Sequence, residues 1–445
     1  MVDLAEGKFL DSLQDEFEFT LDDMKVLVER FHREMGEGLA GKPSSLKMLP
    51  AYVDRASGKE SGKFIALDFG GTNFRVLQVH LDGAGGAELD HTAKFVIPGA
   101  VMRGTGTQLF NFIAQSIKKF FNYIEIDPDK KRELGFTFSF PMKQDSIASG
   151  VLINWTKGFT ATGVVNANVV KLLNAALKKY GLDNIKVAAL ANDTVGTLAA
   201  KSYEEPGSDV GIIFGTGTNA CYRERVSKIK KFKGQYDGDH MIVNTEWGNF
   251  DKLRLNEYDM KLDKSTNNPG KQVMEKMISG MYLGEVTRLV ITDLIKTKRI
   301  FAGSKVKFSK GNFKTRHMSL VESDKSESLM KIEGYLEGIG ILDSTAEDRA
   351  ILRKVCRIVS RRAARISAAA ISAVVTWMDP KLQGSHIVAI DGTLYEKYPR
   401  FRRSIIDALR ELHGDESEKI ELTQAKDGSG IGVAIVAAVA TRSRR

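Results

Sequence analysis

Two turns rich in glycine and threonine occur in the two halves of the sequence, each between apolar, strand-like runs. The first turn, Gly70-Gly71-Thr72-Asn73, separates the runs 64–69 and 74–79, and the second lies within 209–222. Glycines let backbone N–H groups approach a ligand closely, and N–H groups around a concave turn attract phosphate. The repeat predicts two related lobes that face each other across a cleft. Taken alone, either stretch could also be a plain tight turn.

Charged residues accompany the first turn. Asp68 stands near the end of the strand before it, and Arg75 follows two residues after Asn73. A carboxylate, a glycine turn, a hydroxyl and a cation within eight residues suit a metal-bound polyphosphate. The eight-residue Walker pattern and clusters of Cys and His are both missing from the sequence.

An acidic residue is predicted at the junction of a buried strand and a helix. The strand is Lys186–Leu190, and Asn192-Asp193-Thr194 follows it directly. Such a junction can project a carboxylate into a cleft at the carboxyl end of a sheet. Capping the helix is the alternative role for either Asn192 or Asp193. One of the two can cap while the other serves as a general base.

Three further polar stretches are ambiguous when each is read alone. Lys157, in the loop Asn154–Phe159, could stabilise charge on a transferring phosphoryl group, or it could be a surface lysine. Local pattern favours an exposed strand position for Glu246 and a solvated helix face for Glu275. As a set, these carboxylates and amides offer the paired acceptors and donors that a polyhydroxylated sugar requires.

Strands and helices alternate through the chain, which predicts an α/β protein with mixed sheets. The stretch 80–91 is expected to be a turn between strands, and 204–208 has the composition of a boundary between lobes. A helix is expected over 273–295, interrupted at Gly280 and Gly284. Another is expected over 348–378, whose arginine stripe favours a solvated face.

The composition limits the classes of function. The net charge is +9, but the positive residues are spread along the chain without interleaved aromatics, so nucleic-acid binding is not expected. The two cysteines, Cys221 and Cys356, favour a reducing compartment over a disulfide scaffold. The N-terminus lacks the apolar core of a signal peptide, and the longest apolar run, 431–440, is too short to span a bilayer. We expect a cytoplasmic protein without membrane insertion.

Ten blocks of this sequence, in order from about residue 20 to the end, resemble the eukaryotic-type hexokinase and glucokinase family. The blocks are 67–75, 135–141, 154–159, 192–197, 215–222, 246–248, 269–272, 275–284, 390–395 and 427–430. The length resembles a single catalytic unit and not the tandem, double-length form. Met142 departs from the family, where this position is often Cys. The segment between Asn249 and Pro269 looks shorter than usual, which leaves the rim of the large lobe and any dimer contact open.

The resemblance implies an actin-like, ribonuclease-H-like fold with two lobes and mixed sheets around a cleft. It implies N-terminal helices (1–60) on the large lobe, a small lobe (61–205), a large lobe (206–428) and a C-terminal helix (429–445) that returns to the small lobe. The implied activity is transfer of a phosphoryl group from ATP, with Mg²⁺, to the 6-hydroxyl of a hexose, with glucose as the expected hexose, as the first step of glycolysis. The implied partners are hexose and ATP, in a monomer or a homodimer.

The resemblance also implies roles for individual residues. Asp193 would be the general base, with Lys157 beside it, and Asp68 and Asp193 would hold the metal through water. The sugar pocket would be lined by Ser139, Phe140, Thr156, Lys157, Asn192, Asp193, Asn219, Glu246, Gln272 and Glu275. The nucleotide and its phosphates would contact Asp68, Gly70, Gly71, Thr72, Asn73, Arg75, Gly215, Thr216, Gly217, Thr218, Thr315, Arg316, Ser319, Gly392, Thr393 and Ser429.

Two other functions compete with this prediction. A hexose sensor on the same fold would bind sugar without useful turnover, yet it would have no need of Asp193 and Lys157. An actin- or chaperone-like ATPase would hydrolyse ATP without sugar and would have no use for the sugar-binding set.

Overall fold

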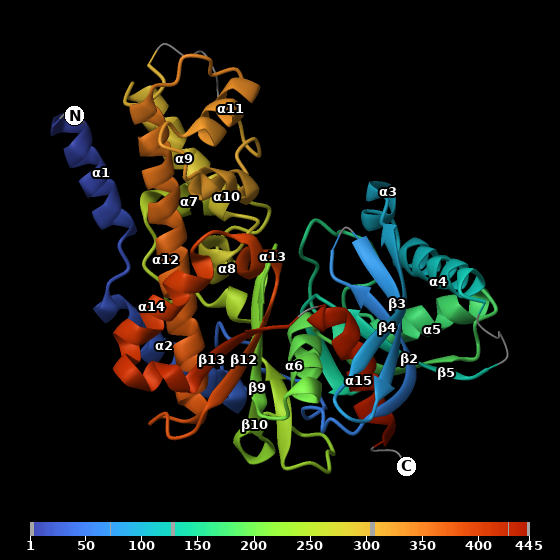
Figure 1. The fold of residues 1–445 in the computed structure, drawn as a ribbon. Helices are drawn as coiled ribbons and strands as arrows, with labels where there is room; N and C mark the ends of the chain where they lie inside the picture. Colours follow the sequence, from blue (N-terminus) through green and yellow to red (C-terminus); the bar gives the residue numbers. More distant parts are fainter. Residues whose placement is uncertain (1–3, 72, 126–129, 303–307, 426, 443–445) are drawn as a thin grey trace.

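The computed structural model describes residues 4–71, 73–125, 130–302, 308–425 and 427–442. Two mixed sheets form its centre (Figure 1). One has the strand order β4-β3-β2-β5-β8, and the other has the order β1-β11-β10-β9-β12-β13. The predicted α/β class with mixed sheets is therefore confirmed.

The first sheet consists of β2 (Ser61–Phe69), β3 (Asn73–Asp82), β4 (Ala87–Val96), β5 (Arg132–Phe138) and β8 (Ile185–Ala191). Strands β2, β5 and β8 are parallel, whereas β3 and β4 continue antiparallel from β2. Strand β3 extends to Asp82 and β4 begins at Ala87, so the expected turn over 80–91 is wrong in its bounds. The turn is shorter because the glycine-rich residues 83–86 alone supply the reversal.

The second sheet contains β1 (Leu49–Pro50), β9 (Ser208–Phe214), β10 (Thr218–Arg225), β11 (His240–Asn244), β12 (His386–Asp391) and β13 (Ile420–Gln424). Strands β9, β12 and β13 are parallel, and β10 and β11 run antiparallel. A separate two-stranded sheet joins β6 (Met142–Ser146) to β7 (Ser149–Leu152).

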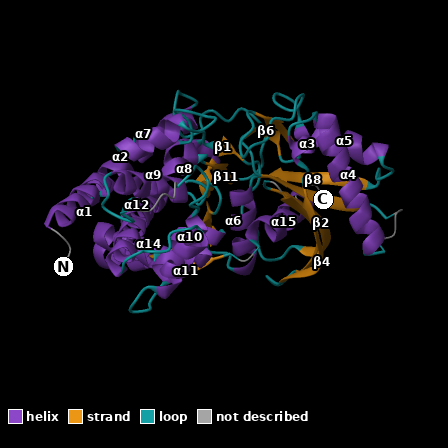
Figure 2. Cartoon of the chain, turned by 90° about the horizontal axis from the view of Figure 1, so that it is seen from above, coloured by secondary structure: helices purple, strands orange, loops and turns teal. Residues whose placement is uncertain are grey.

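Two helices lie between the large sheets, α6 (Asp193–Glu204) and α15 (Gly428–Arg442) (Figures 1 and 2). They approach unusually closely, because a Cβ on Gly432 would stand 1.8 Å from the carbonyl oxygen of Gly196. Helix α15 also packs on β2, β5 and β8, although it is the last element of the chain. Small side chains over 431–440 permit this contact.

Three helices within residues 99–179 cover the outer face of the first sheet. They are α3 (Gly99–Met102), α4 (Gly106–Tyr123) and α5 (Val169–Lys179). Their apolar faces share one core with β2, β5 and β8. Asn168 caps α5, and the Thr105–Gln108 capping box begins α4.

Helices of the second half surround α12 (Ala346–Met378), which the N-terminal helices α1 (Leu4–Phe17) and α2 (Leu21–Ala40) also contact (Figure 1). The other members are α7 (Glu257–Lys264), α8 (Val273–Ile278), α9 (Leu283–Lys296), α10 (Thr315–Ser323), α11 (Met330–Gly338), α13 (Thr393–Lys397) and α14 (Phe401–His413), with short 3₁₀ turns at Val226–Lys228, Trp247–Asn249 and Gly414–Lys419. The expected helix over 273–295 is two helices, and Gly284 lies inside α9. Within the described residues, no helix is both long and apolar enough to cross a membrane.

Candidate active site

The residues predicted to bind sugar line one cavity between the two large sheets. It is bounded by Ser139, Phe140, Pro141, Thr156, Lys157, Asn192, Asp193, Ile213, Gly217, Thr218, Asn219, Glu246, Gln272 and Glu275. Every residue of the predicted sugar set is among them. Pro141 and Ile213 were missed because neither carries a polar group. Gly217 and Thr218 were assigned to phosphate, but they lie in the wall of this cavity.

The junction of β8 and α6 separates the two roles that the sequence left open. Asn192 caps α6, because its Oδ1 accepts from the backbone N–H of Thr194 at 3.0 Å and from the Thr194 hydroxyl at 2.9 Å. Asp193 is the first residue of the helix, and its carboxylate lines the cavity. Its Oδ1 accepts one backbone hydrogen bond, from Thr194 at 3.0 Å. The carboxylate is thereby oriented and still faces the cavity.

Lys157 is a half-buried residue whose ammonium bridges two elements of the first half. Its Nζ donates to the carbonyl oxygens of Gly70 at 2.9 Å and Ser139 at 2.8 Å. The loop beneath it is held by aromatic packing, with Trp155 stacked on Phe159 at 5.2 Å. The cation therefore stands where the first glycine turn meets the cavity, and the reading of Lys157 as an ordinary surface lysine is wrong.

An amide network forms the opposite wall. The Nδ2 of Asn219 donates to Asn244 at 2.8 Å, to Asn192 at 3.2 Å and to Glu246 at 3.4 Å. Asn244 in turn donates to Glu246 at 2.9 Å. Glu246 is buried, so its local reading as an exposed strand residue is wrong. The error arises because the strand ends at Asn244 and the chain turns inward at Glu246, where φ is 54°.

Glu275 and Gln272 complete this wall from the start of α8. Glu275 accepts from the backbone N–H of Thr218 at 3.0 Å, which joins it to the second glycine turn. It lines the cavity, so a solvated helix face is also wrong for this residue. Burial raises the pKa of both Glu246 and Glu275, and the charge of Asp193 adds to both shifts. The buried Oε1 of Gln272 has no hydrogen-bond partner among the described residues, so it can accept from a ligand.

Lys157, Glu246 and Gln272 share one backbone feature, a φ of 54–55°. Residues with side chains rarely adopt this left-handed conformation, and such strain clusters at functional sites. The strain aims three polar side chains at the same cavity. Neither the types of these residues nor their positions in the sequence predicted this left-handed backbone conformation.

A second cavity adjoins the second glycine turn. Its walls are Gly215, Thr216, Gly280, Thr315, Arg316, Ser319, Thr393, Leu394, Lys397 and Tyr398. Six of these were predicted nucleotide residues, and Gly280, Leu394, Lys397 and Tyr398 were missed. The turn is tied to the segment between α8 and α9 because the backbone N–H of Gly280 donates to the Gly215 carbonyl oxygen at 2.9 Å. Gly392 lies behind it, with φ 119° and its Cβ position 2.3 Å from the Phe214 oxygen.

The first turn carries an ion-pair cluster. Arg75 contacts Asp68 at 2.8 Å and Asp427 at 2.8 Å, and the Ser429 hydroxyl donates to Asp68 at 3.2 Å. Gly70, Gly71 and Asn73 lie in the same turn, whereas Thr72 lies outside the described residues. Arg75 was predicted beside phosphate, but its described partners are carboxylates.

Asp391, at the end of β12, was not predicted as a site residue. The pKa of its carboxyl is raised to about 6, chiefly by burial and in addition by the charges of Asp427 and Asp68. The carboxylates of Asp68, Asp391 and Asp427 outnumber the single cation of Arg75. A divalent cation with oxygen ligands would offset this excess negative charge. This charge balance fits Mg²⁺.

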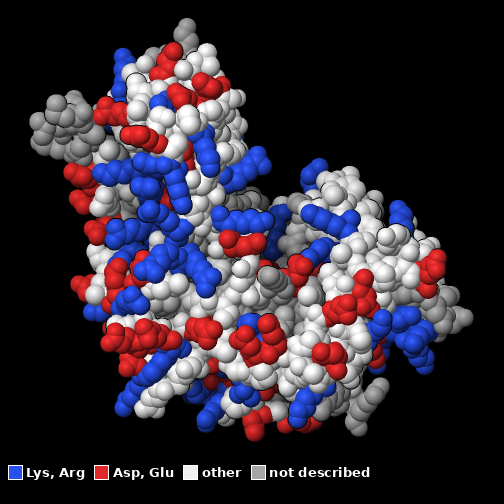
Figure 3. Space-filling model, viewed as in Figure 1, with Lys and Arg blue, Asp and Glu red and all other residues white. Residues whose placement is uncertain are grey.

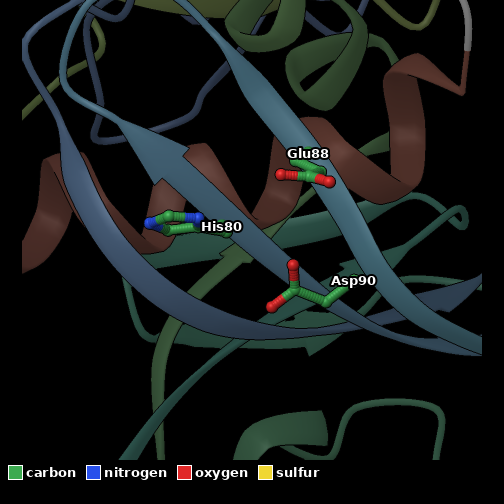
Figure 4. A group of neighbouring side chains, drawn as sticks. All are labelled: His80, Glu88 and Asp90. Carbon is green, nitrogen blue, oxygen red and sulfur yellow. The ribbon is translucent and has the colours of Figure 1, made fainter.

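A different group of possible metal ligands lies elsewhere. In the described residues, the ligand atoms of His80, Glu88 and Asp90 come within 4.8 Å of one another (Figure 4). Asp90 is already paired with Lys63 at 2.8 Å. The strand rises by about 23 Å from Asn73 at the turn to His80. We therefore give this group no part in the active site.

Comparisons with known proteins agree with this geometry. Two family models, both described as hexokinase, match residues 9–203 and 209–439. The chain is 43% identical to Hexokinase-7 of Oryza sativa subsp. japonica, over 91% of each chain. It is 37% identical to Hexokinase-1 of Schizosaccharomyces pombe, over 98% of this chain and 91% of that one.

A solved structure of hexokinase from Schistosoma mansoni, complexed with glucose, superposes with a TM-score of 0.90. It is 35% identical and covers 98% of this chain and 100% of its own. The match confirms the predicted actin-like fold.

Proposed function

This chain belongs to the hexokinase family and phosphorylates a hexose to hexose 6-phosphate, and we propose that the hexose is glucose and that Asp193 is its general base. The family uses ATP, and we propose Mg²⁺ as its companion. One observation carries the proposal: Asp193 shares a single cavity with the amide network and with Lys157. That cavity adjoins the second glycine turn through Gly217 and Thr218, and the first through the contact of Lys157 with Gly70.

Hydroxyl recognition is assigned to the wall opposite Lys157. Glu246 and Glu275 can accept hydrogen bonds from sugar hydroxyls, and Asn192 and Asn219 can each donate and accept. The orphaned Oε1 of Gln272 gains a partner when a hydroxyl donates to it. Rejection of a sugar that lacks a hydroxyl follows, because a buried polar group would then be left unpaired.

Proton transfer is assigned to Asp193. Its carboxylate takes the proton of the 6-hydroxyl as that oxygen forms a bond to the γ-phosphorus, and the bond from phosphorus to the bridging oxygen of ADP breaks. The Lys157 ammonium and the N–H groups of the Thr216 turn stabilise charge on the transferring group. Positioning and charge stabilisation therefore account for most of the catalysis.

The nucleotide is assigned to the cavity lined by Thr315, Arg316, Ser319 and Thr393, with its phosphates between the two glycine turns. Mg²⁺, when bound, neutralises phosphate charge, and Asp68 and Asp193 would hold it through water. Asp391 is added to this acidic set. The Ser429 hydroxyl, which donates to Asp68, would hold that carboxylate in place.

We propose the lobe division 61–205 and 206–428, with the first 60 residues on the large lobe and 429–445 on the small one. The packing of α2 on α12 and of α15 on β2 supports it. Sugar-driven closure of these lobes would complete the site and suppress ATP hydrolysis by water. A hexose-dependent fall in the radius of gyration would test the closure.

We also propose the compartment in which the enzyme acts and its oligomeric state. Cys221 and Cys356 are both free, buried thiols, which supports a reducing compartment such as the cytoplasm. A monomer and a homodimer both remain open, and light scattering distinguishes them.

Replacing Asp193 tests the mechanism. We expect Asp193→Ala to lower kcat by roughly two to four orders of magnitude, the usual scale for a general base, and to retain measurable glucose binding. Asp183→Ala, at an exposed aspartate beyond α5, is the matched control. Near-normal turnover of Asp193→Ala would remove this residue from the mechanism.

Substrate identity is tested by comparing kcat/KM for glucose, mannose and fructose. We expect the highest value for glucose. A higher value for either of the other sugars would overturn the glucose assignment while leaving the role of Asp193 intact.

A further inference from the structure

A third cavity, with basic and aromatic side chains in its walls, lies between α1 and α12, in the helical half of the molecule and apart from the sugar and nucleotide cavities. Its volume is about 220 Å³. Its walls are Gln14, Phe17, Glu18, Phe19, Lys354, Arg357, Ile358, Arg361, Arg362 and Arg365. The arginine stripe that the sequence places on a solvated helix face therefore forms one wall of a cavity.

Helical geometry brings these cations together. Lys354, Arg357, Arg361 and Arg365 are separated by three, four and four residues, so they share one face of α12. The row extends over about 16 Å at 1.5 Å per residue. Figure 3 shows Lys and Arg side chains gathered on this side of the molecule, over the middle of α12.

Two of the arginines in the wall already form ion pairs, although the Nε of Arg362, like that of Arg357, is buried without a hydrogen-bond partner among the described residues. Arg362 holds Asp259 through two hydrogen bonds of 2.7 Å, and its guanidinium lies 4.4 Å from the centre of the Phe17 ring. Arg365 pairs with Glu411 at 2.7 Å and donates to the carbonyl oxygen of Phe19. These contacts hold Arg362 and Arg365 in place, and they do not involve Arg357 or Arg361.

Arg357 and Arg361 are in a different position, because neither forms a salt bridge within the described part of the chain. The Nε of Arg357 is buried there without a hydrogen-bond partner. Burial lowers the pKa of Arg357, and the charges of Arg353 and Arg400 lower it further, against the opposing charge of Glu322. A buried N–H donor without a partner costs free energy unless an acceptor, such as an oxygen of a bound anion, reaches it.

We propose that this cavity binds a small phosphorylated metabolite, with its phosphate held by Arg357 and Arg361. Guanidinium groups suit phosphate because they donate two parallel hydrogen bonds. Phe17, Phe19 and Ile358 would contact the apolar part of the ligand, while Gln14 and Glu18 would accept from its hydroxyls. Glu18 is the single acidic residue in the described wall, so the cavity favours an anion that also carries hydroxyl groups.

The test is calorimetric titration of the full chain, with the active site filled by glucose and Mg·ADP. The probes are inorganic phosphate, ribose 5-phosphate and AMP, which separate phosphate alone from phosphate joined to a sugar or a nucleoside. We expect one additional binding site, tighter for ribose 5-phosphate or AMP than for inorganic phosphate. Inorganic phosphate binding as tightly as both would overturn the assignment of the hydroxyl contacts.

Arg361→Gln is the main variant because Arg361 is exposed and its loss should not affect folding. It should weaken binding roughly 10- to 100-fold, the range expected for one charge-assisted hydrogen-bonded contact. Arg357→Gln should act in the same direction. Arg403→Gln, at an exposed arginine of α14 paired with Asp407, is the control and should bind as the wild type does.

Activity separates this proposal from the assigned mechanism. In the absence of added phosphate compounds, Arg361→Gln should retain kcat and both KM values within about twofold, because the cavity is not part of the catalytic machinery. Absence of the additional site in the wild type, or equal losses in Arg361→Gln and Arg403→Gln, would overturn the proposal.

Discussion

The two glycine hairpins have the same place in two sheets of the same design, yet they are built from different chemistry. The order β4-β3-β2-β5-β8 corresponds strand by strand to β11-β10-β9-β12-β13, with the hairpin β2–β3 matching β9–β10. Aligning Thr72-Asn73 with Thr218-Asn219 places Arg75 opposite Cys221, and aligning Phe69 with Phe214, the last paired residue before each turn, places Asp68 opposite Ile213. The charged pair of the first hairpin is thus replaced by uncharged residues in the second.

The turns themselves also differ. In the first hairpin Phe69 pairs with Phe74, and in the second Phe214 pairs with Thr218, so the second loop is one residue shorter. The second turn donates to Glu275 and places Asn219 in the sugar cavity. The first turn is braced by Arg75, Asp68 and α15. Topology fixes where the turns lie, and the difference between their side chains is the reason why we propose a different substrate for each turn.

The largest difference in kcat/KM is expected between variants of Asn219 and Asn73, the asparagines that follow the two turns. Asn219→Ala leaves the acceptors of Asn192, Asn244 and Glu246 without their shared donor, at a cost of about 2–3 kcal/mol. We expect kcat/KM for hexose to fall roughly 100-fold, with the KM for ATP within about threefold. Asn73→Ala, outside the sugar cavity, should lower kcat/KM for hexose less than about fivefold. Steady-state kinetics decides, and equal losses would contradict a division of roles between the hairpins.

The next effect concerns the charge of the first hairpin. Arg75→Gln removes the cation that pairs with Asp68 and Asp427, so these carboxylates would repel the phosphates of ATP. We expect the KM for ATP to rise roughly 10- to 30-fold, as for the loss of one charge-assisted contact, with the KM for hexose nearly unchanged. Arg225→Gln, at the exposed end of β10, serves as the control. A rise confined to the KM for hexose would reverse the assignment.

A smaller effect tests how closely each turn is packed. A Cβ on Gly217 would stand 2.6 Å from Oε2 of Glu275, whereas one on Gly71 would have nothing within 4 Å. We expect Gly217→Ala to displace Glu275 and raise the KM for hexose about tenfold, the scale of a cost near 1.4 kcal/mol. Gly71→Ala should remain within about twofold of the wild type. Steady-state kinetics of the two variants measures this difference. A larger rise in the KM for hexose in Gly71→Ala than in Gly217→Ala would contradict the prediction.

The smallest effect is on stability and arises from the excess acid beside the first hairpin. The pKa of Asp391 is raised to about 6, so the folded chain binds this proton more tightly than the unfolded chain does. The tighter proton binding of Asp391 adds to the free energy of unfolding. This contribution is complete below the pKa of aspartate in the unfolded chain, near 3.9, and is lost as the pH rises through 6. Asp391→Asn should therefore be more stable than wild type by about 2 kcal/mol at pH 8, with the difference shrinking toward pH 4.

Thermal unfolding without nucleotide or Mg²⁺ measures this difference, and Asp237→Asn at an exposed position is the control. A destabilised Asp391→Asn at pH 8 would show that its carboxylate is compensated by neighbours.

Much of the architecture could be predicted from local pattern. The strand-to-helix junction at Asn192-Asp193, the glycine hairpins and the small residues of α15 each carry their own signal, because capping, turn formation and close packing depend on nearby residue types. The wrong or missing predictions concern residues whose role depends on their burial in the folded chain. Glu246 and Glu275 look like surface residues in their own segments, and Asp391 ends a strand without any local mark of function.

The sequence by itself determined the fold class and the family, because ten short blocks in fixed order constrain both more strongly than any one of them. Tertiary structure alone decided that Asp193 and the Asn219 amide line the same cavity, and that Arg75, which faces Asp68 within its own hairpin, is also paired with Asp427. The contact of Arg75 with Asp427 and the cavity around Asp193 join residues far apart in the chain, so they exist only after α6 and α15 have packed between the two sheets. Local preference can encode a turn or a cap, but the charge and burial around a side chain depend on what the rest of the chain brings to it.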